Sequence, residues 1–470
     1  MTLTIYSDAT RNHQRLLDAL RRDYEEKYSR SKAAHAAAEQ VLVDGISHGA
    51  RSFAPYPFRI TSAQGAQVVD LDGNRIVDFW QGHYANILGH NPPLVRESLA
   101  TALSQGIGLQ TGLPSESETE FAQLLAQVLD VERVRFTTAG TLATMYAIML
   151  ACGYTGRRLV VKVAGGWHGA NPMALKGVDR SNGGFDAAES AGVSASVTED
   201  ILVTRFNDAD HLRELFQSVG EQIACLIFEP CMGGAGFIPA TSEFMQAARD
   251  LTTQYGALLI LDEVITGFRY CASGAQRLYG VKPDLSTFGK IVGGGMPVSV
   301  VVGRADVMDC SSQKATNRVW FNGGTFSAHP LSLLAGQTMV EYLRDHEDEV
   351  YPILAAKGER LRKGIERVFA DRGILARCTG HGNDVVAGGS LSSIYFPRQA
   401  DFYPQSAEDF TDPSLSDVVL REKALKLGLL LHNVNVVHGL GAVSTCHTDQ
   451  DMDAVFEACD AFALRLLREG

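Results

Sequence analysis

The chain has 470 residues, of which 45% are hydrophobic and 20% charged, and its formal net charge is −12. This composition is typical of a globular enzyme with two or more lobes, since a single core rarely grows to this size. The acidic balance, without any basic run, argues against nucleic acid and against anionic membranes as partners.

The cysteines and the first residues bear on the compartment. Eight cysteines are scattered along the chain without a CxxC pair, which favours reduced thiols over a disulfide framework or a zinc site. The first residues lack the apolar core of a signal peptide, and no apolar run reaches the length of a membrane span. We therefore expect a cytoplasmic protein without a metal ion.

The N-terminal part predicts helices, then a loop, then a hairpin. Residues 8–45 are rich in Ala, Leu, Arg and Glu, and they predict helical structure ending near a glycine. Residues 49–60 contain two prolines and read as a turn-rich loop. Residues 66–82 alternate on both sides of Asp72-Gly73, which predicts a β-hairpin.

The middle of the chain alternates between helical and strand patterns. Glu116 and Glu118 begin a segment whose apolar residues recur at helical spacing, so its apolar face is expected in the core. Short apolar runs predict buried strands at residues 134–136, 159–163, 224–228 and 257–261. Residues 345–470 mix helical runs with short strands, including LGLLLH, and predict a smaller α+β lobe.

Two short segments carry chemistry. Thr141 and Gly140 lie in a small, hydroxyl-bearing turn that opens a helix, where free N–H groups and the helix dipole favour a phosphate. Asp262 follows the apolar run 257–261, at the end of a strand where open α/β sheets bind ligands. Lys290 follows a second strand-like piece and precedes three glycines.

A lysine and an acid brought together in this way suit pyridoxal 5′-phosphate. The aldehyde of this cofactor needs a partly desolvated amine for a Schiff base, and its pyridine nitrogen needs a carboxylate to stay protonated. Residue types alone would also allow a surface lysine, a helix-capping aspartate and an ordinary helix N-terminus.

The segments LDEVITGFR and TFGKIVGGGMPV resemble class III (subgroup II) aminotransferases, in the branch of glutamate-1-semialdehyde 2,1-aminomutase and the β-amino-acid aminotransferases. The resemblance implies an α/β protein of the fold type I pyridoxal-phosphate-dependent transferases, in which a large domain with a mostly parallel seven-stranded sheet accompanies a smaller α+β domain. It divides the chain into an N-terminal segment, 1–75, that contributes to the small domain and to dimer contacts, a large cofactor-binding domain, 76–335, and a C-terminal small domain, 336–470.

The resemblance assigns roles to the residues around the cofactor. Lys290 would carry it as a Schiff base and Asp262 would contact its pyridine nitrogen, and both are expected to be catalytic. The backbone of Gly140 and Thr141 would bind the phosphate, although the family's Ser-Gly-Thr-Glu is Ala-Gly-Thr-Leu here.

Four more residues are expected beside the cofactor. Trp167 would stack on one face of the ring, and Val264 would cover the other. His168 would be a hydrogen-bonding residue beside the ring rather than a general base. Glu229 would have a supporting role near the ring oxygen.

The resemblance also extends to the substrate and to a second subunit. Arg51 would bind the substrate carboxylate, because a guanidinium pairs a carboxylate through two hydrogen bonds, and Arg59 is a weaker candidate for the same role. Thr325 lies in a segment whose threonine reaches the phosphate of the other subunit in the family, which predicts a homodimer with shared sites.

The expected reaction is transfer of an amino group between a carboxylate-bearing amino acid, α or β, and an oxo acid, through the Lys290 Schiff base and a pyridoxamine form. The alternatives are an intramolecular aminomutase and an epimerase. A cofactor-binding dimer without activity is disfavoured by the presence of both Asp262 and Lys290. Residues 432–442 contain no carboxylate where the aminomutase has a glutamate, which argues against the aminomutase reaction.

Overall fold

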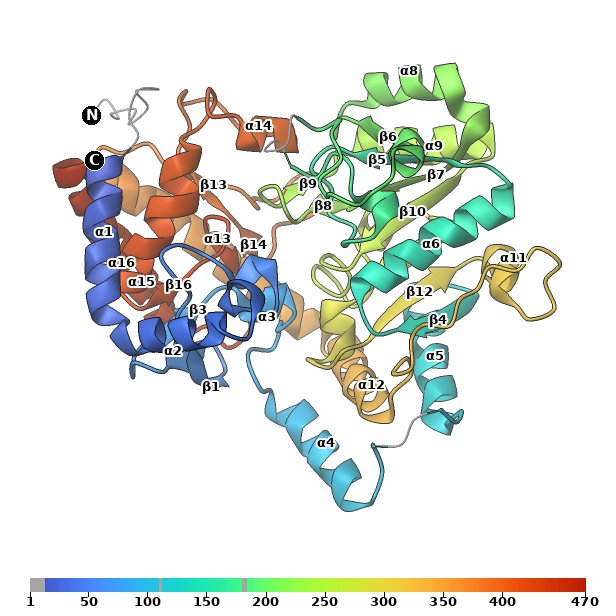
Figure 1. Cartoon of the computed structure of the whole chain (residues 1–470), viewed down its shortest axis with the longest axis horizontal. Helices are drawn as coiled ribbons and strands as arrows, with labels where there is room; N and C mark the ends of the chain where they lie inside the picture. The colour runs from blue at the N-terminus through green and yellow to red at the C-terminus, as the bar shows by residue number, and fades with distance from the viewer. Residues whose placement is uncertain (1–12, 110–111, 180–183) are drawn as a thin grey trace.

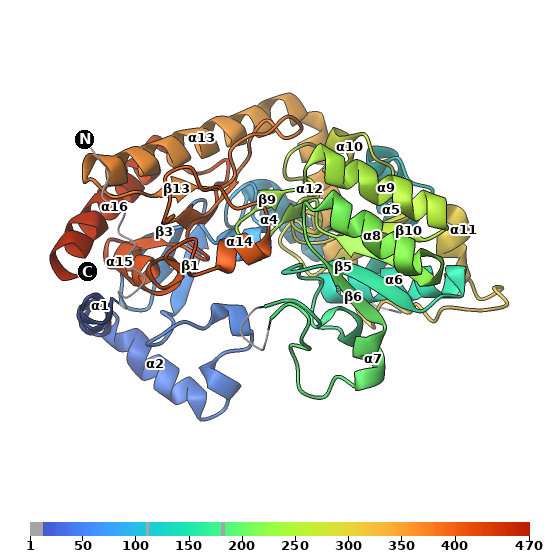
Figure 2. The same cartoon turned by 90° about the horizontal axis from the view of Figure 1, so that it is seen from above.

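The structure is a computed structural model that describes residues 13–109, 112–179 and 184–470. The middle of the chain forms one half of the molecule, and the first and last parts lie together in the other half (Figure 1). The long helix α13 (Glu347–Asp371) runs along the terminal half, as the view from above shows (Figure 2).

The middle half is built on a seven-stranded sheet. Its strand order is β4 (Arg133–Thr137), β12 (Ser299–Gly303), β11 (Leu285–Phe288), β10 (Leu258–Glu263), β7 (Ile223–Phe228), β5 (Leu159–Val163) and β6 (Ile201–Thr204). All neighbours pair in parallel except β12, which is antiparallel to both β11 and β4. The predicted mostly parallel, seven-stranded sheet is confirmed.

Helices cover both faces of this sheet. They and the two remaining strands of this half are α5 (Glu116–Leu129), α6 (Gly140–Thr155), α7 (Ala195–Glu199), α8 (Ala209–Val219), β8 (Cys231–Met232), β9 (Ile238–Pro239), α9 (Ser242–Tyr255), α10 (Gln276–Tyr279) and α11 (Ala305–Met308).

The alternation of side chains along β10 decides which face each residue serves. Leu258 and Ile260 pack in the core beneath α6, whereas Leu259 and Leu261 pack in the core beneath α8 and α9. Because neighbours along a strand point to opposite faces, Asp262 continues the α6 side. The acid at the end of this strand therefore points toward the N-terminus of α6.

The terminal half draws on both ends of the chain. Its elements are α1 (Gln14–Lys27), α2 (Ser29–Glu39), β1 (Ile60–Gln64), β2 (Gln67–Asp70), β3 (Arg75–Asp78), β13 (Arg377–Cys378), β14 (Leu391–Ser392), β15 (Ile394–Tyr395), α14 (Ala407–Thr411), α15 (Lys426–Leu431), β16 (Val434–Asn435), β17 (Gly441–Ala442) and α16 (Asp449–Glu469).

A single core joins these distant segments. The buried Leu16, Leu20 and Tyr24 of α1 belong to the same apolar cluster as Ile365 of α13 and Phe462 of α16. Strand β16 pairs in parallel with β3, so one sheet also contains residues from both ends. The predicted hairpin is confirmed, because β2 and β3 pair antiparallel around Asp72-Gly73.

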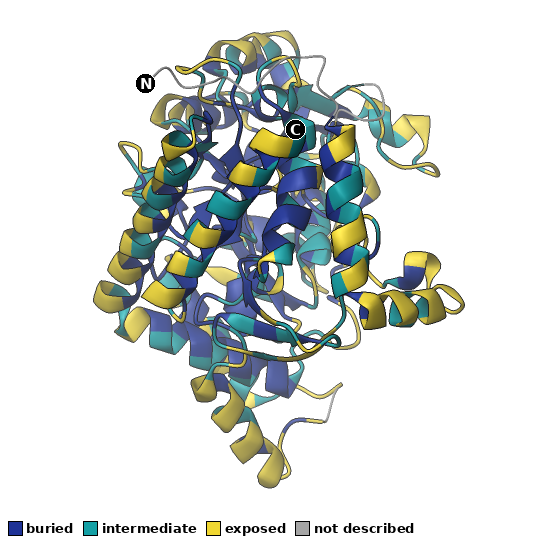
Figure 3. Ribbon diagram, turned by 90° about the vertical axis from the view of Figure 1, so that its left-hand side faces the viewer, coloured by how far each residue is buried: buried dark blue, intermediate teal, exposed yellow. Residues whose placement is uncertain are grey.

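Three helices lie between the halves or project from them. These are α3 (Gln81–Tyr84), α4 (Pro93–Ser104) and α12 (Pro330–Asp345). Helix α4 extends away from the body at the bottom of Figure 1, and most of its residues are exposed (Figure 3). Strand β3 crosses residues 75/76 and α12 crosses 335/336, and the domain boundaries at those positions stay predictions.

Two expectations from the sequence are corrected. The run LGLLLH was expected as a strand, but Leu427–Leu431 belong to helix α15, since a short leucine run fits a buried helix equally well and leucine favours helix. The N-terminal helical stretch was expected over 8–45, but it divides into α1 and α2 at Tyr28 and ends at Glu39; residues 8–12 lie outside the described residues.

All eight cysteines lie in the described part of the chain and are free thiols. Within the same residues, no helix combines the length and the apolar character that a membrane crossing requires. No group of three or more His, Cys, Asp or Glu side chains in that part could hold a metal ion.

Candidate active site

Asp262 lies at the centre of a hydrogen-bond network at the end of β10. His168 Nδ1 donates to one carboxylate oxygen at 2.8 Å, and the Val264 N–H and the Thr287 hydroxyl donate to the other, each at 3.1 Å. Thr287 lies directly beside Asp262 in the parallel register of β10 and β11. Three donors therefore fix the buried carboxylate of Asp262 in one orientation. The pKa of His168 is lowered, mainly because the imidazole is buried.

Lys290 begins the short 3₁₀ helix η5 (Lys290–Gly293), two residues after the end of β11. Its backbone is left-handed, with a φ of 54°, which is rare for a residue with a side chain and is typical of strained functional positions. Desolvation lowers the pKa of Lys290 to about 8, against the opposing charges of Asp262 and Glu229. A useful share of this amine is therefore neutral in mildly alkaline water.

Glu229 follows β7 and contacts the same region from the neighbouring strand. Its two oxygens accept hydrogen bonds from the N–H groups of Trp167 and Gly233, each at 3.0 Å. Burial, and then the charge of Asp262, raise the pKa of Glu229 to about 7. The carboxyl is thus fixed beside Trp167 and acts electrostatically on Lys290.

The N-terminus of α6 faces this group of residues. The N–H groups of Leu142 and Ala143 donate to the Ala139 carbonyl, which leaves those of Gly140 and Thr141 outside the helical ladder. Ala139 supplies no side-chain cap. Two free donors at the positive end of a helix are suited to a phosphate.

Val264 fills the space between the helix N-terminus and the lysine. A Cβ added to Gly140 would meet Val264 at 3.0 Å, and one added to Gly289, the neighbour of Lys290, would meet it at 3.3 Å. Both glycines therefore allow Val264 to lie close to the backbone. This brings the predicted ring-covering side chain between the predicted phosphate donors and Lys290.

These residues fit the cofactor that the sequence predicts. A desolvated amine at Lys290 can bond to an aldehyde, the carboxylate of Asp262 can hold a ring nitrogen proton, and the start of α6 can bind a phosphate. His168 Nε2 is buried and has no hydrogen-bond partner among the described residues. The donor set therefore has the three functions that pyridoxal 5′-phosphate requires.

Three predicted residues are exposed. The Trp167 side chain is 46% exposed, although its backbone is tied to Glu229. Thr325 is exposed, in a loop whose Gly323 lies against the carbonyl of Phe136; its predicted role across a dimer stays a prediction. Arg51 ends the exposed 3₁₀ turn η2 (Gly49–Arg51).

Arg59, the weaker candidate for the carboxylate, is directed elsewhere. Its guanidinium donates to the Gly45 carbonyl at 2.6 Å and lies 3.4 Å from His35. These contacts tie it to the N-terminal segment. We therefore keep Arg51 as the candidate for the substrate carboxylate.

Sequence reasoning missed Thr287 and His83. Thr287 could have been found, because the ends of two neighbouring parallel strands meet at one edge of the sheet. His83 lies in an irregular turn, and the positive charge of Lys290 contributes to its lowered pKa after burial and the electrostatic effects of His48 and Arg51. No sequence pattern signals that proximity.

Lys162 is a second buried lysine close to the site. It lies on β5, its Nζ donates to the Lys176 carbonyl at 2.7 Å, and burial lowers its pKa to about 7, against the charges of Glu229 and Glu189. A folded pKa below the unfolded value means that the unfolded chain binds more protons between pH 7 and about 10.5. This residue therefore makes stability rise with pH across that window.

Lys162→Met is expected to stabilise the apoprotein by about 1–3 kcal/mol at pH 7, since it removes a buried charge but leaves the Lys176 carbonyl without its donor. Urea unfolding midpoints at pH 7 and pH 9.5 check this, and the gain should shrink at the higher pH. Lys282→Met, at an exposed lysine, is the control and should change little. A less stable Lys162→Met protein at pH 7 would contradict the assignment.

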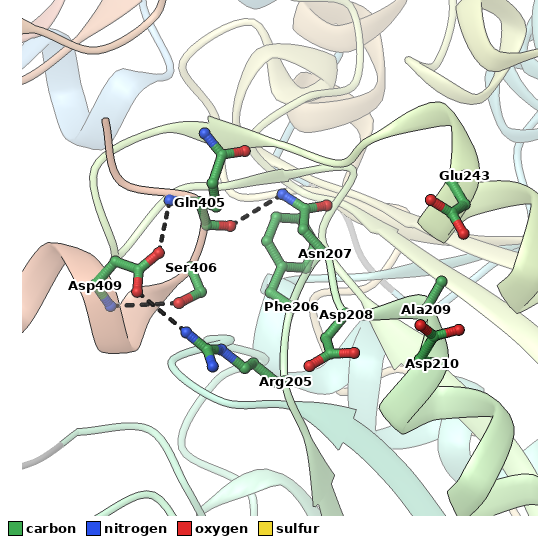
Figure 4. Close-up of a pocket in the computed structure, with 10 residues that line it drawn as sticks. All are labelled: Arg205, Phe206, Asn207, Asp208, Ala209, Asp210, Glu243, Gln405, Ser406 and Asp409. Carbon is green, nitrogen blue, oxygen red and sulfur yellow. Dashed lines mark hydrogen bonds and ion pairs between the residues drawn. The ribbon is translucent and has the colours of Figure 1, made fainter. Parts of the chain in front are cut away.

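A surface hollow of about 370 Å³ lies away from these residues, between the start of α8 and α14 (Figure 4). Acidic side chains of the hollow already pair with groups of the protein. Asp409 accepts from Arg205 at 3.1 Å, and Asp208 caps α8 by accepting from the His211 N–H at 2.9 Å. The hollow has no lysine and no residue of the Asp262 network, so the chemistry is placed at Lys290 instead.

Comparison with known proteins agrees with this geometry. The Aminotransferase class-III family model matches residues 48–388. The chain is similar to the glutamate-1-semialdehyde 2,1-aminomutase of Thermoplasma acidophilum, at 35% identity over 92% of this chain and 98% of that protein.

Solved structures give a second comparison. The chain resembles a β-phenylalanine aminotransferase from Variovorax paradoxus, with a TM-score of 0.83 and 30% identity over 96% of this chain and 97% of that one. It also resembles an ω-transaminase from Sphaerobacter thermophilus, with a TM-score of 0.83 and 31% identity over 95% of this chain and 99% of that one.

Proposed function

Because this chain belongs to the class-III aminotransferase family, whose cofactor is pyridoxal 5′-phosphate, we propose that it transfers an amino group between a carboxylate-bearing amino acid and an oxo acid. The observation that carries this proposal is the meeting of a desolvated Lys290 with the anchored carboxylate of Asp262. The resemblance to two solved aminotransferases at 30% and 31% identity supports transfer.

The proposed roles follow from the contacts of each side chain. When bound, the cofactor supplies an aldehyde and an electron-accepting ring. Lys290 supplies the amine that holds it and, once displaced by a substrate amine, the base that takes a proton from the substrate carbon. Asp262 holds a proton at the ring nitrogen, and His168 fixes the orientation of that carboxylate.

The other side chains shape and charge the site. Gly140 and Thr141 offer backbone donors to the phosphate, while Val264 and Trp167 provide apolar surface for the two ring faces. Glu229, with its pKa raised to about 7, can hold a proton beside Lys290. Arg51 would select substrates that carry a carboxylate.

The function is tested by adding single α- and β-amino acids to the cofactor-loaded protein without any acceptor and following its visible spectrum. Conversion of the bound cofactor to its aminated form, with release of an oxo acid, is the expected result. An unchanged cofactor together with an isomerised or epimerised product would overturn transfer in favour of an aminomutase or an epimerase.

An intramolecular aminomutase is the second candidate, favoured by the name of the relative that is 35% identical along nearly its whole length. The residues described so far serve both reactions. The lack of a carboxylate in residues 432–442 still supports transfer, although the Glu422 carboxylate lies 3.4 Å from His438 in that segment.

We also propose that the protein is a homodimer. Large apolar side chains are exposed on α4, on the segment after it and near Thr325: Leu94, Leu103, Ile107, Leu109, Leu113, Trp320 and Phe326. Such a collection of exposed apolar side chains marks an interaction surface. A second copy of the chain seated there would bring the Thr325 loop toward the neighbouring site.

A further inference from the structure

Four consecutive residues that form α3, Gln81–Tyr84, have a left-handed backbone. Their φ angles are 45°, 63°, 60° and 68°. Only Gly82 avoids the cost of roughly 1–2 kcal/mol that this conformation imposes on a residue with a side chain. Strain of this kind persists where the surroundings hold it in place, and it gathers at functional sites.

Both ends of this turn are held by buried charged groups. The Asp78 carboxylate accepts hydrogen bonds from the N–H groups of Trp80, at 3.1 Å, and Gln81, at 2.9 Å. At the other end, the Arg269 guanidinium donates to the Tyr84 carbonyl. The turn also contacts η5 and β17 and lies where the two halves meet (Figure 1). The backbone of the turn, including that of His83 in its middle, is therefore held in place.

His83 is the residue of this turn that the inference concerns. Its ring lies 4.2 Å from the Trp80 ring and 4.8 Å from the His48 ring, centroid to centroid. Its Nε2 atom is closed to solvent and has no hydrogen-bond partner in the part of the chain that the structure describes. Buried polar atoms are normally paired, so an orphaned nitrogen in a strained, anchored turn points to a ligand.

The charges around His83 indicate the kind of ligand. Burial, followed by the electrostatic effects of His48, Arg51 and Lys290, lowers the pKa of His83 to about 4. The His48 ring, which contacts His83, lies just before η2, Arg51 ends η2, and Lys290 begins η5, which contacts the turn. Two cationic side chains, Arg51 and Lys290, acting on a neutral imidazole favour an anion beside them.

We propose that His83 is a substrate-binding residue which, together with Arg51, receives the carboxylate of the substrate while its amino group lies at Lys290. The inference rests on the proposed function, since it takes a carboxylate-bearing amine as the substrate. The carboxylate is then bound by two side chains rather than by one exposed arginine, and the imidazole of the pair has a fixed position. Amines without a carboxylate would make no contact with this pair.

His83→Asn tests the proposal on the cofactor-loaded enzyme, because asparagine tolerates the left-handed backbone. The half-reaction is followed with 3-aminopropanoate and with propylamine. The concentration of 3-aminopropanoate needed for half-saturation should rise about tenfold, as expected for the loss of one hydrogen bond to a charged group. The maximal rate, and the half-saturating concentration of propylamine, should stay within about twofold.

A second measurement does not need turnover. Propionate should raise the thermal midpoint of the wild-type enzyme by binding at this pair, and His83→Asn and Arg51→Ala should each lose most of that rise. His432→Asn, at an exposed histidine next to α15, should keep it. If no amine reacts at all, the proposed function fails, and the propionate result still decides the role of His83.

Two outcomes would overturn the proposal. Equal weakening of 3-aminopropanoate and propylamine would mean that His83 only supports the surrounding structure. Unchanged binding of both 3-aminopropanoate and propionate would mean that the carboxylate lies elsewhere. If the thermal midpoint of His83→Asn without propionate is far below that of the wild type, His83→Gln is measured in the same way.

Discussion

Lys290→Ala is expected to abolish turnover, lowering kcat by at least ~10⁴, because both the covalent attachment and the proton transfer depend on this amine. The fold should be retained. Lys290 lies at the start of a short 3₁₀ turn, and its side chain makes no hydrogen bond or ion pair within the described residues. Circular dichroism and the thermal midpoint check the fold, and single-turnover rates check the chemistry.

Chemical rescue makes this test specific. A small amine such as ethylamine can enter the space of the missing side chain and act as the base, so it should restore part of the proton-transfer rate in Lys290→Ala. Lys282→Ala, at an exposed lysine of the same segment that pairs with Asp130, should match the wild type. Turnover of Lys290→Ala near the wild-type level would remove Lys290 from the centre of the mechanism.

Asp262→Asn is expected to slow the half-reaction by about 10³, similar to the loss of a key electrostatic group in other enzymes. The change removes the negative charge that would hold a proton on the ring nitrogen. It also disturbs the network, because His168, Val264 and Thr287 all donate to Asp262, and an asparagine directs its own donor at one of them. The rate of the spectral change on adding an amino acid measures the effect.

Glu263→Gln is the matched control for Asp262→Asn. Glu263 is the next residue of β10, is equally buried and accepts from the Gln276 N–H at 2.8 Å. Burial raises the pKa of Glu263 to about 7, so a neutral glutamine resembles its protonated form. Its side chain lies on the other face of the strand, and the half-reaction should keep its wild-type rate. Equal slowing of both variants would mean that general destabilisation, rather than the Asp262 charge, explains the result.

The sequence predicted most strands of the sheet for physical reasons, although it did not signal β6 and β12. Strands β5, β7 and β10 are short and mostly apolar, and such runs have few alternatives once flanked by turns and helices. Asp262 lies at the end of β10 and Lys290 lies two residues after the end of β11, and these two strands pair directly. Local pattern and tertiary position therefore agree there.

The left-handed turn and the acid-imidazole pair could not be predicted in the same way. Gln81, His83 and Tyr84 adopt positive φ values in a turn whose start is held by the nearby Asp78 and whose end is held by Arg269, 185 positions away. The bond between His168 and Asp262 joins residues 94 positions apart. Such contacts are set by the packing of whole elements, on which the local sequence carries little information.

The core shared by the two ends of the chain has a consequence for synthesis. Helix α1 shares its core with α13 and α16, so most of its apolar face lacks its native partners until the ribosome has added roughly 320 further residues, a delay of about 16–64 s at ordinary elongation rates. The middle half can assemble during that delay, whereas the emerging N-terminal helix waits with its leucines uncovered. The nascent chain is therefore expected to depend on chaperones at its beginning rather than at its centre.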